Sequence, residues 1–435
     1  MRMNDLAQWV AAQSSVAPQV QRAAVHVVAD AVGAAIAGYS LAGAVAARKT
    51  AGNIWGPGPC TIWFTSQKGS LSTAAFANSM ATCILDLDDG HRAAAGHPGA
   101  AIVPAVLAAA QTLDATGEKA LIAIAIGYEV GIRIAAARDL RAIDTLITGR
   151  WCGQGIAAAI GWLKGDNAEQ IAEAMAIAGA VAPHMLVAEY TQIGNHTKEA
   201  IPFGTANGIL AGALAAEGFK GPLDILDHDS FDPKVLVNGN GGKWFIETTY
   251  FKPYSCCRWI HAPIDAILAV GEDIDWNEVS EIEVETFGRT MSLNNQFRPS
   301  SVQAAQYSTP FCVAAAAING AKCLQPMSDQ LLTDERVLTL AAKVRMSVDP
   351  VLDRMFPAGV PGRVTIKTGS LTISKEVLAP KGEATNPMNW DELVAKLSAI
   401  SVPRLGSAGT AEVIEALLVL RNQSEISPLL KCLAR

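Results

Sequence analysis

The sequence predicts a mainly α-helical protein, in which a large all-helical domain carries a smaller α+β domain. The first half is rich in alanine, and its apolar residues recur at helical spacing, as in Val28, Val32 and Ile36. After the glycine-rich stretch 238–242, runs with alternating or β-branched residues appear, and helical spacing returns near the end of the chain. A chain of 435 residues, 50% hydrophobic and 17% charged, is long and apolar enough for more than one packed core.

In order along the chain, the first 218 residues or so predict tightly packed helices. Ile122, Ile126 and Val130 repeat the helical spacing. Alanine and glycine at many interior positions allow helices to approach closely, so we expect several helices to be buried on all sides. Breaks are expected at Gly117, at 165–167 and at 218–222.

The second half predicts strands over 279–287, 344–348 and 364–373, with helices over 314–324 and 334–343. Such a mixture is typical of an α+β unit. The final helical segment is expected to pack back on the first domain. We therefore predict a helical domain formed by residues 1–246 and 397–435, and an α+β domain formed by residues 247–396.

The charge balance excludes some classes of partner. The chain has 34 lysines and arginines against 41 acidic residues, a net charge of −7. A mild acidic excess does not attract phosphate backbones, so no nucleic-acid partner is expected. Any anionic substrate must be held by a local cluster of cations.

Neither a membrane partner nor export is expected. The longest uncharged run, 31–47, contains glycines and the polar residues Tyr39 and Ser40, which indicates a buried helix followed by a turn. The first residues lack the apolar core and cleavage site of a signal peptide, so a cytoplasmic location is predicted. The eight cysteines show no CxxC spacing and are expected to be reduced and mostly buried.

The densest polar cluster in the helical part is formed by residues 85–92 and 96–99. It contains Asp86, His91, Arg92 and His97, and Pro98 then opens an apolar helix. Because proline at a first helical turn leaves the following N–H groups free, His97 would stand at the positive end of that helix, where a substrate carboxylate can bind. The alternative is that these carboxylates cap helices and the histidines are surface residues.

A metal site is a further alternative for this cluster. Asp86, Asp88, His91 and His97 are all potential ligands, but no HExxH or other fixed ligand spacing is present. We therefore expect no metal.

Two further clusters carry cations. Lys198 precedes a glycine- and alanine-rich helix, where it either snorkels to the surface or lies in a cavity as a general base. Lys252, Tyr254 and Arg258 lie where the helical pattern gives way to strands, and a cleft between domains is a preferred site for small molecules. A solvated linker is the alternative there. The sequence lacks GxGxxG, GxxxxGK[ST] and GxSxG motifs in the required context, so dinucleotide, P-loop and serine-hydrolase chemistries have no support.

These clusters resemble the MmgE/PrpD family in order and spacing. The matching segments are 30–38, 86–89, 97–98, 127–129, 155–165, 197–198 and 252–261. The resemblance implies a helical larger domain with a smaller α+β domain, a homodimer, and no cofactor. It also implies a small polycarboxylate substrate, with Asp86, His97, Lys198 and Lys252 at active-site positions.

From the resemblance and the clusters together, we predict three catalytic residues, His97, Lys198 and Asp86. The predicted substrate-binding residues are Lys252, Arg258, His91, Arg92 and Tyr254.

Two departures from the family pattern bear on the reaction. The histidine usual before the helix at 155–165 is missing, and Phe311 replaces the tyrosine usual three residues after Ser308, although Tyr307 is close by. Expelling water requires a proton donor, whereas epimerisation requires only bases that reach the Cα proton. We therefore expect a cofactor-independent epimerase for an iminodisuccinate-like dicarboxylate. The alternatives are a 2-methylcitrate dehydratase-type hydro-lyase, a cis-aconitate decarboxylase-type lyase, and an inactive helical binding protein.

Overall fold

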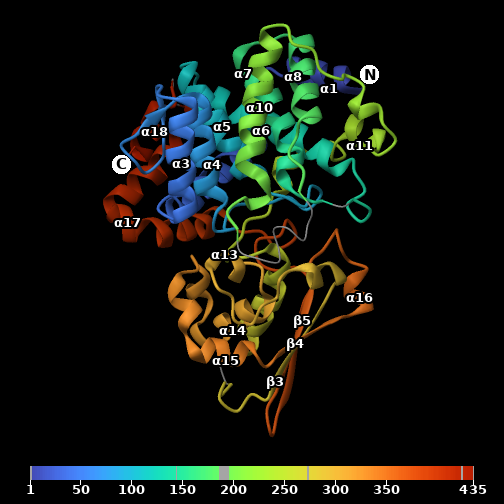
Figure 1. Cartoon of the computed structure of the whole chain (residues 1–435), viewed down its shortest axis with the longest axis vertical. Coiled ribbons are helices and arrows are strands. Elements are labelled where there is room, and N and C mark those ends of the chain that lie inside the picture. The colour runs from blue at the N-terminus through green and yellow to red at the C-terminus, as the bar shows by residue number, and fades with distance from the viewer. Residues whose placement is uncertain (1, 144, 186–194, 272–273, 423–424, 435) are drawn as a thin grey trace.

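The computed structural model describes residues 2–143, 145–185, 195–271, 274–422 and 425–434. Figure 1 shows two lobes along the long axis, a larger helical one and a smaller one that holds the main sheet. The chain is thus mainly helical with a smaller α+β part, as the sequence predicts. The helices of the larger lobe are α1 (Arg2–Ala11), α2 (Pro18–Gly38), α3 (Ala42–Trp55), α4 (Leu71–Cys83), α5 (Pro98–Thr112), α6 (Gly117–Ala136), α7 (Cys152–Lys164), α8 (Ala168–Ala180), α10 (Ile201–Ala216), α11 (Pro233–Asn238), α17 (Trp390–Val419) and α18 (Ser427–Leu433).

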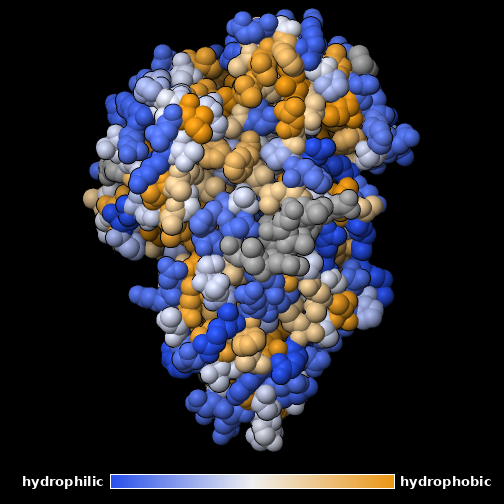
Figure 2. All heavy atoms as spheres, in the orientation of Figure 1, coloured by the Kyte–Doolittle hydropathy of each residue, from blue (hydrophilic) through white to orange (hydrophobic). Residues whose placement is uncertain are grey.

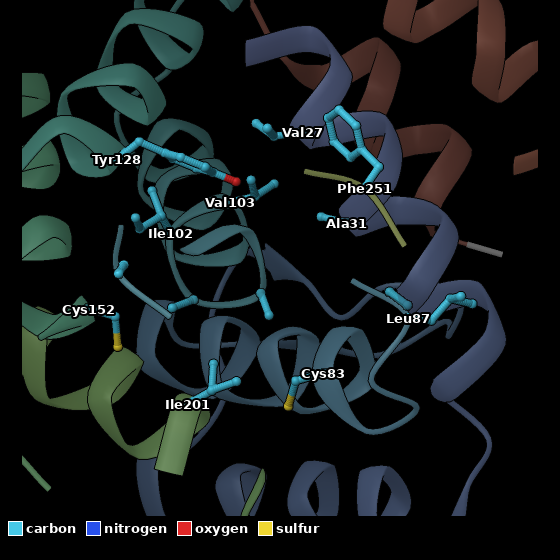
Figure 3. Close-up of a cluster of buried hydrophobic side chains, with 14 of the residues drawn as sticks. Val27, Ala31, Cys83, Leu87, Ile102, Val103, Tyr128, Cys152, Ile201 and Phe251 are labelled. Atoms are coloured by element: carbon cyan, nitrogen blue, oxygen red, sulfur yellow. The ribbon is translucent and has the colours of Figure 1, made fainter. Parts of the chain in front are cut away.

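The core of the larger lobe is built from helices buried on most sides. Every residue of α5 from Pro98 to Ala110 is buried. Gly127 of α6 and Gly155 of α7 let these two helices touch, because a Cβ at Gly155 would lie 2.4 Å from the carbonyl oxygen of Gly127. Figure 3 shows Val27 and Ala31 of α2 near Phe251, so the segment that carries Lys252 lies against the larger lobe.

The uncharged run 31–47 forms a buried helix end, a turn and the start of the next helix, as predicted. Helix α2 is long and apolar enough to cross a membrane by length and composition, yet 72% of its most apolar window is buried inside the lobe. All eight cysteines are free, and five of them are buried. A small antiparallel pair, β1 (Cys60–Thr61) with β2 (Lys68–Gly69), was not predicted from the sequence.

The smaller lobe is a four-stranded sheet covered by helices. Its strands are β3 (Glu281–Thr286), β4 (Val344–Val348), β5 (Gly362–Lys367) and β6 (Thr372–Val377), in the order β4-β3-β5-β6. β3 runs parallel to β4 and antiparallel to β5. Its buried residues alternate, as the sequence pattern predicts. The helices are α12 (His261–Val270), α13 (Val302–Ala305), α14 (Thr309–Asn319), α15 (Glu335–Ala341) and α16 (Pro350–Asp353).

The single strand predicted over 364–373 is wrong, because this run forms a hairpin. β5 pairs antiparallel with β6, and the Thr368 N–H donates to the Leu371 carbonyl across the turn between them. The Gly369–Ser370 dipeptide supplies the turn residues.

Helix α17 returns the chain to the larger lobe, where it packs on α2 (Figure 1). It begins at Trp390 and is interrupted at Gly406, whose φ of 68° lies in the left-handed region. The Lys396 ammonium lies 2.7 Å from Asp30 Oδ1 and 2.8 Å from the Leu87 carbonyl oxygen. Helix α17 therefore stabilises the loop that carries the densest polar cluster.

Candidate active site

Three buried carboxylates follow α4, and one of them caps the next helix. Asp86, Asp88 and Asp89 are each at most 2% exposed, although carboxylates are seldom buried without partners. Asp89 Oδ1 accepts the Gly99 N–H at 2.9 Å, and its Oδ2 accepts the Tyr128 hydroxyl at 2.6 Å. The capping alternative therefore holds for Asp89, whereas Asp86 and Asp88 face other groups.

His97 stands at the N-terminus of α5, as predicted, and carboxylates surround its ring. Nδ1 lies 3.0 Å from Asp88 Oδ2, and Nε2 lies 3.6 Å from Asp86 Oδ1 and 3.5 Å from Glu199 Oε1. Burial and Lys252 favour the neutral ring, but Asp88 and Glu199 outweigh them and raise the pKa of His97 to about 10. At neutral pH His97 is therefore a proton donor.

Lys252 is fully buried beside Asp86. Its Nζ donates to Asp86 Oδ1 at 2.6 Å and to the Asp86 carbonyl oxygen at 3.2 Å, and it lies 3.3 Å from His97 Nδ1. Burial disfavours the charged forms of Lys252 and Asp86, but the attraction between the two opposite charges outweighs that penalty. The pKa of Lys252 is raised by Asp86 and Asp88, and the pKa of Asp86 is lowered by Lys252, Lys198 and His97. Both groups are therefore ionised at neutral pH.

Lys198 is buried rather than snorkelling, with 4% of its surface exposed. Its Nζ donates to Gln306 Oε1 at 2.8 Å and lies 3.1 Å from the Tyr307 hydroxyl. Gln306 in turn donates to the Ile84 carbonyl at 3.2 Å, next to the Asp86 loop. These bonds bring the end of α13 to the larger lobe and fix the position of the amine.

The backbone around Lys198 is strained. Lys198, Glu199 and Ala200 have φ values of 44°, 54° and 53°, a left-handed conformation that non-glycine residues adopt at a cost. Glu199 Oε2 accepts the N–H of Thr148 at 3.1 Å and its hydroxyl at 2.9 Å. The Thr148 hydroxyl oxygen also accepts the His97 N–H at 2.9 Å, so this segment holds the His97 loop.

The sequence did not single out Glu199 or Gln306 as site residues. Glu199 directly follows Lys198, and a polar residue beside a predicted base was the available signal. Gln306 meets Lys198 across a separation of 108 residues, and no local pattern marks that contact.

The other predicted binding residues form a second network. Arg92 and Arg258 both donate to Glu383 Oε1, at 2.9 and 2.8 Å, and both guanidinium groups stack on the Tyr250 ring. Arg258 also donates to the carbonyls of Lys381 and Pro380. Arg92 thus ties the Asp86 loop to Glu383, and Arg258 ties segment 252–261 to segment 380–383.

His91 and Tyr254 are also engaged elsewhere. His91 Nε2 lies 2.9 Å from the Thr248 hydroxyl, and burial with the nearby Arg92 charge lowers its pKa to about 3, so the ring is neutral. The Tyr254 hydroxyl donates to Asp265 at 2.8 Å. Each of these four side chains is hydrogen-bonded within the protein, and the substrate-binding role of Arg92, Arg258, His91 and Tyr254 stays a prediction.

A metal could in principle use part of this cluster. In the part of the chain that the structure describes, ligand atoms of Asp86, Asp88 and His97 lie within 4.8 Å of one another. His91 is not among them. The Lys252 ammonium, 2.6 Å from Asp86 Oδ1, already supplies a positive charge to these carboxylates.

We predict that activity does not depend on a metal. Lys252 neutralises Asp86, and the raised pKa of His97 keeps its ring protonated at neutral pH. A metal ion that entered this cluster would therefore meet two positive groups. Exhaustive chelation should leave turnover unchanged, and elemental analysis should find no stoichiometric metal. Activity that is lost on chelation and restored by one particular divalent ion would contradict this prediction.

Comparison with known proteins places the fold and this site in a family. The MmgE/PrpD N-terminal domain model matches residues 4–241, and the MmgE/PrpD C-terminal domain model matches residues 254–422. The chain therefore belongs to the MmgE/PrpD family, which confirms the resemblance seen in the sequence.

Two curated relatives extend over most of the chain. Cis-aconitate decarboxylase from Aspergillus terreus is 26% identical over 416 residues, covering 87% of this chain and 84% of the relative. The cis-aconitate decarboxylase-like protein oryM from Aspergillus oryzae is 22% identical over 472 residues, covering 98% and 96%.

Proposed function

We propose that this protein is an enzyme that moves a proton at the carbon next to a carboxylate of a small di- or tricarboxylate, without a cofactor. The proposed reaction is epimerisation of an iminodisuccinate-like substrate. The observation that carries the proposal is the cluster around Asp86, in which Lys252 Nζ lies 2.6 Å and His97 Nε2 lies 3.6 Å from Asp86 Oδ1. The charges of Lys252, Lys198 and His97 together lower the pKa of Asp86. Membership of the MmgE/PrpD family supports the same kind of chemistry.

In the proposed mechanism, two side chains transfer protons on opposite faces of one carbon. Lys198 takes the Cα proton. Protonated His97 then donates a proton to the other face, which inverts the configuration. The carbanion that forms between these steps places extra negative charge on the adjacent carboxylate. The Lys252 charge stabilises that anion in a site that excludes water.

A lyase is the second candidate, and one observation favours it. The Tyr307 hydroxyl, 3.1 Å from Lys198 Nζ, offers a proton donor near the position where the family tyrosine is missing. Protonated His97 is another donor. The relatives named cis-aconitate decarboxylase support this candidate as well. A binding protein without activity remains the third candidate.

Incubation in deuterated water with iminodisuccinate, 2-methylcitrate or cis-aconitate separates the candidates. Deuterium at Cα of an inverted product without a new double bond supports the epimerase. Loss of water or carbon dioxide supports a lyase instead, and binding without isotope exchange supports the third candidate. Lys198→Ala provides the control for exchange catalysed by the buffer.

The pH dependence of this reaction is our second prediction. Since the pKa of His97 is raised to about 10, kcat/KM should be lost only as pH rises through about 10. By linkage, the same shift contributes stability that is complete below the unfolded pKa of about 6.5 and is lost as pH rises through about 10. Asp88→Asn should move the alkaline limb to lower pH, because it removes the carboxylate that contributes most to raising this pKa. A pH–rate profile that is identical in wild type and variant would reject the role of His97 as donor.

We also propose that the protein is a homodimer through an apolar face on the larger lobe. Ile54, Trp55, Phe203 and Leu210 are 68, 39, 48 and 57% exposed. Trp55 and Phe203 both pack edge-on against Phe76, and Figure 2 shows apolar side chains gathered over the α10 side of this lobe. Light scattering on wild type and on Leu210→Glu tests the proposal, since the variant should be a monomer. A wild-type monomer would contradict it.

A further inference from the structure

We propose that a cavity on the larger lobe, separate from the Asp86 and His97 cluster, binds a small polyanion through Arg138 and Arg150. A polycarboxylate and inorganic phosphate share the chemistry that two guanidinium groups recognise. The proposal does not depend on which reaction the protein performs.

The cavity has a volume of about 660 Å³, a size that accommodates a small molecule. It lies between the end of α6, the start of α7 and segment 222–231. Its polar lining includes Arg138, Arg150, His184, His228 and Asp224. Apart from Asp224, which is exposed, the ionisable groups of this lining are cations or bases.

Within the described residues, the two arginines have no acidic partner. Arg138 Nε donates to the Ala135 carbonyl and Arg150 Nη1 to the Ala182 carbonyl, each at 3.3 Å. Neither arginine forms an ion pair with an acidic residue in the described ranges, whereas Arg133, in the last turn of α6, pairs with Glu129 at 2.8 Å. Two neighbouring guanidinium groups without a counter-charge are an arrangement that a bound anion would stabilise.

An unused hydrogen-bond donor of Arg138 also supports a bound anion. Arg138 Nη2 is buried and has no acceptor among the described residues. A buried donor without an acceptor costs about 1–3 kcal/mol, so such groups in a native fold require an explanation. Burial and the neighbouring Arg150 charge lower the pKa of Arg138 to about 10, which an anion would reverse.

One side chain separates this cavity from the His97 loop. Trp151 lines the cavity, and its ring would lie 2.9 Å from a Cβ on Gly96, the residue before His97. Thr148, which holds both His97 and Glu199, belongs to the same 3-10 turn as Arg150 (Thr148–Arg150). The cavity is thus a distinct site that shares one turn with the candidate active site.

The test is calorimetric titration of the full chain with citrate and, separately, with phosphate at constant ionic strength. Arg138→Gln and Arg150→Gln should each weaken the binding of citrate, of phosphate or of both by tenfold or more. Arg138→Lys should lose less, because it keeps the charge. Arg141→Gln is the matched control, since Arg141 is exposed on the same segment and its guanidinium group donates to the Arg354 carbonyl. Tighter binding of citrate identifies the polycarboxylate, and tighter binding of phosphate identifies the phosphate.

Citrate can also occupy the candidate active site, so the titrations are repeated in a Lys198→Ala background, where the second site should persist. Melting temperatures show whether each variant is folded, and Arg150→Gln keeps the test valid if Arg138→Gln is not. Binding that is unchanged in both folded glutamine variants, or absent from wild type in both arms, would overturn the proposal.

Discussion

Replacing Lys198 by alanine is expected to lower kcat by about 100-fold or more, the scale on which a positioned acid–base group acts. The amine is buried and held by Gln306 and Tyr307, so water cannot easily take its place. In deuterated water the variant should also lose isotope exchange at Cα, because the proposed proton acceptor is gone. Steady-state kinetics and mass spectrometry measure the two effects.

Two controls make this result specific. Lys220→Ala removes a lysine that is 62% exposed and paired only with Glu169 and Glu173, so it should leave kcat unchanged. Gln306→Leu should reduce kcat less than Lys198→Ala, because it removes a bond that positions the amine but keeps the amine itself. Near-normal turnover in a folded Lys198→Ala variant would remove this lysine from the mechanism.

The local features of the site could be predicted from the sequence, because they depend on neighbours along the chain. Pro98 opens α5 and places His97 at its N-terminus, which the residue order alone indicates. The burial of the helices follows from their alanine-rich periodicity in the same way. Asp89 could not be distinguished from Asp86 and Asp88, because its capping bond to Gly99 depends on the exact path of the loop.

Long-range contacts account for the rest. Arg92 and Arg258 have the charge that a carboxylate needs, but Glu383, which lies 291 and 125 residues away in sequence, engages both. No local sequence pattern indicates that a distant carboxylate pairs with these two arginines. The hairpin at 364–373 is a different case, since Gly369 and Ser370 mark the turn in the sequence, but the β-branched residues on both sides favour a single strand.

Lys252→Met is expected to be the most damaging single change for stability. It leaves Asp86 buried without its closest cation, and breaking a buried ion pair on one side costs about 3–5 kcal/mol. Turnover should also fall, because the positive charge proposed to stabilise the carbanion is lost. Urea unfolding and steady-state kinetics measure the two losses separately.

Lys252→Met should also change how the stability of the protein depends on pH in the acid range. Lys252 is the cation that contributes most to holding the pKa of Asp86 below its ordinary value against burial, so the native pair contributes stability that is lost only as pH falls. Without Lys252 the pKa of Asp86 rises, and the acid unfolding transition should move to higher pH. Asp86→Asn in the same chain removes the unpaired charge, so the double variant should recover much of the stability and none of the activity. A single variant that keeps wild-type stability, kcat and KM would show that this buried pair neither supports the fold nor takes part in the reaction.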